Sequence, residues 1–213
     1  VFNTIDVLAF YKNSIIISAL TVAGTLIVCS MAAYPLARMQ FPGRNIVFGA
    51  ILATMILPSE VNFLVNFITV SKLGMGDTYS GVVLPGLAGA VGIFLMKQAF
   101  EAVPNDLVDA ARVDGATEWQ IFWHIMLPLA RPALAALTIL TMVAAWNQYI
   151  WPSIVMASPD KFPLSVGVLY LSGAFSFKIR VVAAGAVLTV LPILIVFLFT
   201  QRYFLRGFDG AVK

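Results

Sequence analysis

Long apolar stretches alternate with polar connections along most of this chain. Five stretches have about the 20-residue length that a helix needs to cross a membrane. They cover residues 13–36, 46–70, 81–100, 132–155 and 181–201. The second stretch contains Leu57-Pro58-Ser59-Glu60, where proline predicts a break in the helix. The pattern therefore predicts an all-α polytopic membrane protein with five transmembrane helices, folded as a single transmembrane domain over residues 1–213.

The composition supports this prediction. Of the 213 residues, 61% are hydrophobic and 11% are charged, and the mean hydropathy is +0.95. Soluble domains carry roughly 25% charged residues, which disfavours a water-soluble helical enzyme. The basic residues are scattered near the ends of the apolar stretches, where they suit a membrane interface. We therefore expect the lipid bilayer as a partner and no nucleic acid.

Two residue types that often carry chemistry are scarce. Cysteine occurs once, as Cys29, and histidine once, as His124. A single cysteine forms neither a disulfide within the chain nor a thiol metal cluster. We therefore expect no metal site in this chain.

The distribution of basic residues predicts an orientation. With five spans, eight Lys and Arg residues fall on one side of the membrane and five on the other, and the richer side is expected to be cytoplasmic. This places the connection 101–131 inside and the connection 157–180 outside. It also places the amino terminus outside. Because the chain begins VFNTID without a Met, we expect a sixth, N-terminal span that is absent from this sequence.

The cytoplasmic connection 101–131 predicts two short helices. Asn105 is a favourable N-cap for the first, and Gly115 can end that helix at positive φ. One face of this helix repeats at i, i+3, i+4 and i+7. That face carries Leu107, Ala110, Ala111 and Asp114. The two alanines give it little side-chain bulk, so that another backbone can approach closely.

The second helix has its own signals. Thr117 and Gln120 have the spacing of a capping box, and Pro128 and Pro132 are expected to stop the helix. Its apolar stripe consists of Trp119, Phe122, Trp123 and Met126. Periodicity alone fits a docking surface and an amphipathic helix lying on the bilayer equally well.

A motif in this connection resembles a known family. Asp109-Ala110-Ala111, then Gly115, then Ile125-Met126-Leu127-Pro128 matches the EAA motif, EAA-x3-G-x9-I-x-LP. This motif is found in the permease subunits of binding-protein-dependent ABC importers. The one departure is Asp for Glu at position 109, a shorter carboxylate. AAYPLARMQFPGR, WNQYIWP and the terminal GFDGAVK resemble the carbohydrate branch, and the chain is similar to the second permease of maltose importers.

The resemblance implies that the connection 101–131 is a coupling loop seated in a groove of a cytoplasmic ATPase subunit. Asp109 would bond a basic group of the ATPase. The residues assigned to this coupling are Asp109, Ala110, Ala111, Asp114, Gly115, Ile125, Leu127 and Pro128. The implied partners are a second permease subunit, two ATPase subunits that bind ATP and Mg, and an extracytoplasmic binding protein that meets the connection 157–180. The implied location is the bacterial or archaeal cell (inner) membrane, and no cofactor is expected in this chain.

Polar residues inside the apolar stretches are candidates for a substrate pathway, because such groups usually face a cavity or a partner. The candidates are Glu60, Asn62, Asn66, Trp146, Asn147 and Tyr149. An aromatic plane beside amide groups suits a sugar. The alternatives are that these groups bond neighbouring helices, and that the connection 157–180 is a re-entrant cover for the pore.

No G-x-x-x-x-G-K-[ST] loop occurs, so the chain does not bind ATP in the P-loop manner, and no hydrolase motif supports an enzyme. The leading hypothesis is a permease subunit of an ATP-driven importer of a sugar, polyol or glycerol phosphate. The alternatives are a self-sufficient secondary transporter or channel, which would carry deep ionisable groups and internal repeats, and a membrane scaffold without transport.

Overall fold

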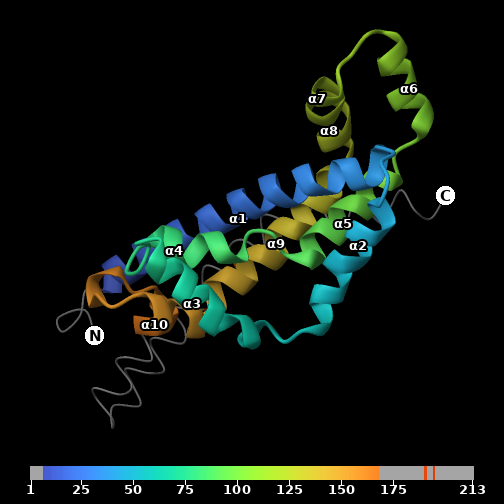
Figure 1. The fold of residues 1–213 in the computed structure, drawn as a ribbon. Coiled ribbons are helices and arrows are strands. Elements are labelled where there is room, and N and C mark those ends of the chain that lie inside the picture. Colours follow the sequence, from blue (N-terminus) through green and yellow to red (C-terminus); the bar gives the residue numbers. More distant parts are fainter. Residues whose placement is uncertain (1–6, 168–189, 191–193, 195–213) are drawn as a thin grey trace. The chain divides into compact units, whose positions relative to one another are not determined.

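The computed structural model describes residues 7–167, 190 and 194, and these residues form helices without strands (Figure 1). The longer helices are α1 (Val7–Arg38), α2 (Arg44–Ala53), α3 (Phe63–Lys72), α5 (Ala90–Glu101), α6 (Asn105–Val113) and α9 (Arg131–Asn147). Shorter helices are α4 (Tyr79–Val83), α7 (Glu118–Ile121), α8 (Leu127–Leu129) and α10 (Ile150–Val155). Single helical turns are η1 (Thr54–Ile56), η2 (Ser59–Asn62), η3 (Leu84–Gly86), η4 (Phe122–Met126) and η5 (Pro159–Lys161).

The first predicted span is confirmed as α1. Within the described residues, Leu8–Arg38 is the one uninterrupted helix that is long and apolar enough to cross a membrane. Two broken pairs also qualify if each counts as one span, so the described residues provide up to three. Almost all of the predicted fifth span, the terminal GFDGAVK and the outer connection beyond residue 167 lie outside the described residues. The number of five spans therefore stays a prediction.

The predicted break in the second stretch is confirmed. The helix formed by α2 and η1 ends at Ile56, and η2 and α3 resume at Ser59. Leu57, between them, has an extended backbone with ψ of 128°. Pro58 follows it, and a residue before proline is disfavoured in the helical region.

The third and fourth stretches are not the continuous helices that the sequence pattern predicts. Between η3 and α5 the helix is interrupted at residues 87–89, next to Pro85 and two glycines. The fourth stretch is interrupted at Gln148 and Tyr149, between α9 and α10. Pro152 explains this second break, because in a continuous helix its ring would clash with the Gln148 carbonyl four residues earlier. That carbonyl instead accepts a hydrogen bond from Ser165 Oγ at 2.8 Å.

The chain divides into two compact units. One comprises Val1–Gly24, Ser59–Gly86 and Ile139–Gln201, and the other Thr25–Pro58, Leu87–Thr138 and Arg202–Lys213. We call them the first and the second unit.

In the second unit, the core gathers apolar side chains from α1, α5, α6, α7, η4 and α9. Its fully buried members include Cys29, Met96, Phe100, Ile121 and Met126. Next to this core, the buried Lys97 bonds Glu101 at 2.6 Å, and its ammonium lies 4.4 Å from the centre of the Phe48 ring. The cation–π contact joins α2 to α5 and gives a buried charge two partners.

In the first unit, the start of α1 holds a segment distant in sequence. Asn13 Nδ2 donates to the carbonyls of Asp160 at 2.7 Å and Phe162 at 3.1 Å, and its Oδ1 accepts from Tyr79 at 2.7 Å. Ser14 Oγ accepts from the backbone N–H of Leu164 at 2.7 Å. These bonds satisfy buried polar groups, and they fasten the described part of the outer connection to α1 and α4.

Candidate functional site

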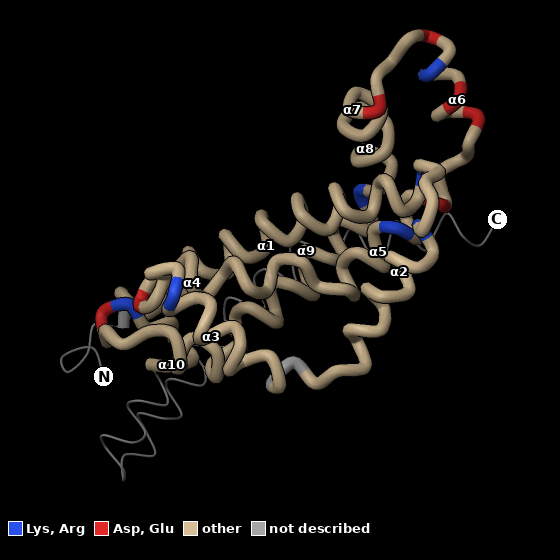
Figure 2. The backbone as a smooth tube through the Cα atoms, viewed as in Figure 1, with Lys and Arg blue, Asp and Glu red and all other residues tan. Residues whose placement is uncertain are grey.

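The predicted coupling loop is a helical hairpin that leaves α5, runs out along α6 and returns through α7, η4 and α8 to α9 (Figure 1). Acidic and basic residues gather on this hairpin and at the ends of α1 and α5 that adjoin it, as Figure 2 shows. The two predicted helices are present, the first as α6 and the second as the helix that begins with α7.

The predicted N-cap at Asn105 is wrong by one residue. Pro104 occupies the cap position without a side-chain cap bond, and Asn105 is already helical. The reason is a distant partner: Asn105 Oδ1 accepts a hydrogen bond from Arg38 Nη1 and is not free to cap its own helix.

Gly115 ends α6 as predicted. Its φ is +82°, a conformation that L side chains rarely adopt. The Gly115 N–H donates to the Arg112 carbonyl at 3.0 Å and the Ala116 N–H to the Ala111 carbonyl at 2.9 Å. This pair of bonds is a Schellman motif, and it satisfies carbonyls at the end of α6.

The predicted capping box is also present. Thr117 Oγ1 accepts from the Gln120 N–H at 3.3 Å, and Gln120 Oε1 accepts from the Thr117 N–H at 2.8 Å. Pro128 itself lies inside the second helix, which ends at Leu129, between the two prolines that are predicted to stop it. The π turn η4 ends two residues before Pro128, and the wider turn relieves the clash that a regular α-helix would create between the ring and the carbonyl four residues back.

The two alanines of the motif lie on different surfaces of the hairpin. Ala110 is exposed, together with Asp114 and with Leu107 at 48%. Ala111 instead packs against the core of the second unit, near the buried Val108. Ala110 therefore leaves the exposed surface of α6 without side-chain bulk. Ala111 instead allows α6 to pack closely against the core of the second unit.

The predicted apolar stripe of the second helix also divides. Phe122 and Met126 are buried in the core, whereas Trp119 and Trp123 are 57% and 45% exposed. Trp119 stacks on Phe122 with ring centres 5.7 Å apart, which fixes the exposed indole on a buried support. Ile121, which was not in the predicted stripe, is fully buried.

The remaining motif positions lie where the hairpin rejoins the bundle. Ile125, Leu127 and Pro128 are all half-buried, and the first two pack against the core of the second unit. These three positions connect the hairpin to α9 rather than forming its exposed surface.

A polar network that the sequence did not reveal surrounds the motif's acidic residue. Asp109 Oδ1 lies 3.2 Å from Arg112 Nη1, and Arg112 Nε lies 2.9 Å from Glu118 Oε1. The other Glu118 oxygen accepts from the Tyr34 hydroxyl at 2.5 Å. The bond to Arg112 holds the pKa of Glu118 below its usual range, and the same bond raises the pKa of Arg112. The hairpin is thus connected to α1 by the hydrogen bond from Tyr34, which precedes Glu118 by 84 residues.

Arg38, one helical turn beyond Tyr34, contacts the start of the hairpin. Its Nη2 donates to the carbonyls of Phe100 and Val103, at the end of α5. A guanidinium at the end of a helix satisfies free carbonyls and complements the negative end of the helix dipole. Neither Arg38 nor Tyr34 stood out in the sequence, because a polar residue near the end of an apolar helix is ordinarily an interfacial residue.

The predicted substrate residues of η2 and α3 lie in the first unit, where α3 contacts α10. Asn62 is exposed, and Asn66, one turn later, is half-buried. Phe63, between them, stacks on Trp151 with ring centres 5.9 Å apart. This contact brings the start of α3 beside α10. The side chain of Glu60 lies outside the described part of the chain.

The three candidates of the WNQYIWP segment differ in exposure. Trp146 is only 2% exposed and lies 6.1 Å from Tyr11, ring centre to ring centre, which supports a packing role. Asn147 and Tyr149 are exposed at the break after α9. Asn147 Nδ2 donates to the Val143 carbonyl at 2.8 Å, which orients the amide of this side chain.

Asp77, which the sequence did not single out, organises the described part of the outer connection. It has a positive φ of 56°, and its Oδ1 accepts from the N–H groups of Ala157 and Ser158 at 3.0 Å each. Its Oδ2 accepts from Lys161 Nζ at 2.8 Å and from Ser158 Oγ at 2.6 Å. The Lys161 and Ser158 bonds hold the pKa of Asp77 far below its usual range.

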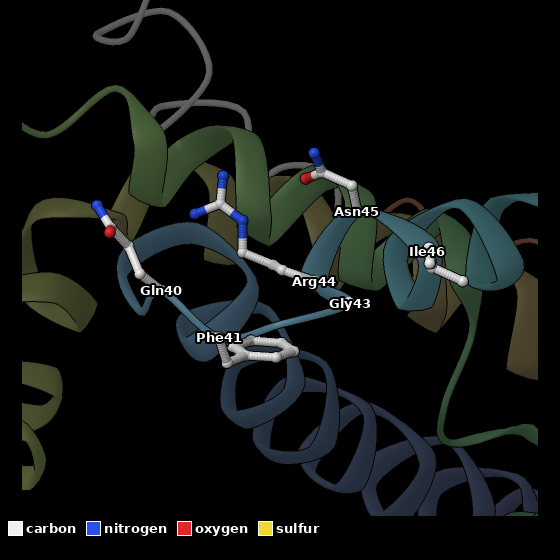
Figure 3. A pocket seen from close by; sticks show the side chains of 6 residues that line it. All are labelled: Gln40, Phe41, Gly43, Arg44, Asn45 and Ile46. Carbon is white, nitrogen blue, oxygen red and sulfur yellow. The ribbon is translucent and has the colours of Figure 1, made fainter.

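A surface pocket of about 490 Å³ lies at the turn between α1 and α2. Figure 3 shows its lining residues: Gln40, Phe41, Gly43, Arg44, Asn45 and Ile46. Arg44 Nη1 donates to the Met39 carbonyl at 3.3 Å across this turn. The pocket contains none of the predicted coupling or substrate residues.

A family model described as "Binding-protein-dependent transport system inner membrane component" matches residues 13–209. The chain belongs to this family. The match spans all the predicted transmembrane stretches and includes the helical hairpin, so the resemblance carried by the motif is confirmed, and the protein is an inner-membrane component of a binding-protein-dependent transport system.

Curated relatives are similar over nearly the whole chain. The arabinooligosaccharides transport system permease protein AraQ of Halalkalibacterium halodurans is 40% identical over 96% of this chain and 74% of the relative. The lactose transport system permease protein LacG of Rhizobium radiobacter is 36% identical over 100% of this chain and 78% of the relative. The sn-glycerol-3-phosphate transport system permease protein UgpE of Pectobacterium atrosepticum is 36% identical over 94% of this chain and 72% of the relative.

A solved structure has the same fold. It is a bacterial ABC transporter involved in the import of the acidic polysaccharide alginate, with a TM-score of 0.84 and 28% identity over 94% of this chain and 76% of that one. The methionine ABC transporter MetNI, at 18% identity and a TM-score of 0.67, shares the fold alone.

Proposed function

We propose that this chain is the transmembrane permease subunit of an ATP-driven importer for a sugar or a related polyol, such as an oligosaccharide, a disaccharide or a glycerol phosphate. An extracytoplasmic binding protein delivers the substrate, and the ATP is hydrolysed by two cytoplasmic ATPase subunits. A second, different permease subunit completes the passage in a bacterial or archaeal membrane. The observation that carries the proposal is the coupling hairpin, whose motif stands on a well-defined pair of helices within a chain of the transport family.

The physical support comes from the exposed surface of α6. Asp109 is 65% exposed at its side chain, and Ala110 beside it has almost no bulk. A carboxylate next to a flat point suits docking, because the charge-assisted bond fixes the register and the small residue permits close approach. Trp119 and Trp123 add exposed aromatic area, which is typical of residues that anchor protein interfaces.

The substrate class rests on the relatives, whose names give arabinooligosaccharides, lactose and glycerol 3-phosphate. We assign Asn62, Asn66, Asn147 and Tyr149 to the passage, since Asn62, Asn147 and Tyr149 are exposed near helix breaks and Asn66 is half-buried one turn after Asn62. We also assign Glu60 to the passage, because of its position in the sequence. Trp146 is assigned to packing.

The test is reconstitution after co-purification. The tagged chain is purified from its native membrane, its partners are identified, and the complex is placed in vesicles with the binding protein. Uptake of labelled arabinooligosaccharide, lactose and glycerol 3-phosphate is then measured with and without ATP. We expect an ATPase subunit in the purified complex and ATP-dependent uptake. Uptake by the chain alone without ATP would instead establish a secondary transporter or channel.

A further inference from the structure

Two side chains of the last turns of α1 hold both ends of the α6 segment of the hairpin. Tyr34 and Arg38 are four residues apart and therefore share one face of the helix. Arg38 bonds the carbonyls of Phe100 and Val103 and the side chain of Asn105, where the hairpin starts. Tyr34 bonds Glu118, at the first residue of α7, where the hairpin turns back.

We propose that this face of α1 is a mounting that positions the coupling hairpin, so that ATPase motion reaches α1 directly as well as through α5 and α9. This inference rests on the proposed function for the source of the motion. The mounting itself is a property of the chain. Its contacts are Tyr34 to Glu118 and Arg38 to the start of α6, and we call these residues positioning residues.

The burial of the contacts supports a specific role. Tyr34 is 5% exposed, and its ring packs edge-to-face against Phe100 and Phe122 at centre distances of 6.2 and 5.3 Å. This packing fixes the orientation of the Tyr34 ring and therefore the position of its hydroxyl. A short hydrogen bond from a hydroxyl to a carboxylate is among the stronger ones in proteins. Exposed ion pairs alone contribute little, so the buried phenol distinguishes this network from an ordinary surface cluster.

Arg112 links the mounting to the docking residue. Its guanidinium is shared between Asp109 at 3.2 Å and Glu118 at 2.9 Å. A cationic group of the ATPase that pairs with Asp109 replaces Arg112 in the longer of these two contacts. Arg112 then pairs with Glu118 alone. Docking at Asp109 thereby strengthens the connection of α7 to α6 and, through Tyr34, to α1.

Two variants weaken the Tyr34–Glu118 contact of the mounting without removing apolar packing. Tyr34→Phe deletes only the hydroxyl, and Glu118→Gln keeps the shape of the side chain but removes its charge. The matched control is Tyr79→Phe, which deletes a hydroxyl bonded to Asn13 at 2.7 Å in the first unit. The first measurement is hydrogen–deuterium exchange of residues 105–121 in the purified chain, which needs no partner.

We expect exchange in this segment to rise about tenfold in Tyr34→Phe and in Glu118→Gln, because each loses a hydrogen bond to a charged group. The double variant should exchange little faster than Glu118→Gln alone, since loss of the carboxylate already weakens the Tyr34 contact together with the Arg112 ion pair. Tyr79→Phe should leave the segment unchanged. Unchanged exchange in both single variants overturns the mounting, whatever the partner of the chain proves to be.

The second measurement is the number of substrate molecules taken up per ATP hydrolysed in the reconstituted importer. A mounting that transmits motion predicts a lower ratio in Tyr34→Phe with normal ATPase association, whereas a merely structural role would reduce assembly and leave the ratio unchanged. A normal ratio in Tyr34→Phe overturns the transmission role. If the wild-type complex shows no ATP-dependent uptake, the proposed function fails, and the exchange measurement alone decides the mounting.

Discussion

Gly115 allows the docking surface to be tested separately from the stability of the hairpin. Its φ of +82° makes any L side chain costly, yet an added Cβ would meet no atom within 4 Å. Gly115→Ala and Gly115→Leu therefore share one backbone penalty of about 1–2 kcal/mol, and the Cβ of each has open space around it. Asn tolerates this conformation better, so Gly115→Asn should cost less than either.

The two larger variants differ only in what they present to a partner. If Gly115 lies in a groove of an ATPase, the leucine overpacks that interface, which typically costs about 1–3 kcal/mol, or roughly 5- to 150-fold in affinity. We therefore expect equal melting temperatures for Gly115→Ala and Gly115→Leu in detergent. ATPase association and uptake should be much weaker for Gly115→Leu.

The assay is quantitative pull-down of the ATPase subunit, followed by uptake into vesicles. Gly74→Leu is the matched control, because Gly74 also has a positive φ, of +67°, and open space around its Cβ, but lies in the loop between α3 and α4. Equal ATPase association in Gly115→Ala and Gly115→Leu would refute the assignment of this surface, as would an equal loss in Gly74→Leu.

Three further predictions follow from the described contacts. Phe122→Ala should lower the free energy of unfolding by about 3–5 kcal/mol, because the ring is 3% exposed, whereas Trp119→Ala should change it little and weaken ATPase pull-down instead. Asn147→Ala should reduce uptake about tenfold at unchanged ATPase pull-down, the effect of losing about one substrate hydrogen bond. Asp77, whose folded pKa is depressed chiefly by Lys161, should stabilise the outer loop above its unfolded pKa of about 3.9 and lose this effect as the pH falls through the lower folded value. Hydrogen exchange of residues 155–161 measures this loss, and Asp77→Asn should show faster exchange already at pH 7.

Each of these has an outcome that contradicts it. An unchanged free energy of unfolding in Phe122→Ala would show that the Phe122 ring does not stabilise the hairpin. Normal uptake by Asn147→Ala would place substrate contact elsewhere, and exchange in Asp77→Asn equal to wild type at pH 7 would show that its carboxylate does not hold the loop.

The sequence predicted the parts of the hairpin that depend on neighbouring residues. Gly115 ends α6 because its own backbone freedom permits the Schellman bonds, and Thr117 caps α7 through Gln120, three residues away. Apolar length likewise predicted α1, since crossing a bilayer requires a run that is visible in the sequence.

Only the tertiary structure decided which of the short helices' faces packs inward. Periodicity groups Ala110 with Ala111 and Trp119 with Phe122, because the nine residues of α6 leave too few positions to separate two faces and the π turn η4 shifts the repeat of the second helix. The core under the hairpin then buries Phe122 and leaves Trp119 exposed.

Contacts between distant segments also overrode local signals. Arg38 takes the side chain of Asn105 that would otherwise cap α6, and Tyr34 reaches Glu118 across 84 residues. Such pairs leave no periodic trace, since neither residue alone differs from an ordinary polar residue at a helix end. The sequence by itself therefore determined the local ends of the helices and their family motif, and the folded chain decided how the hairpin is attached to α1, because that attachment is made by side chains that only folding brings together.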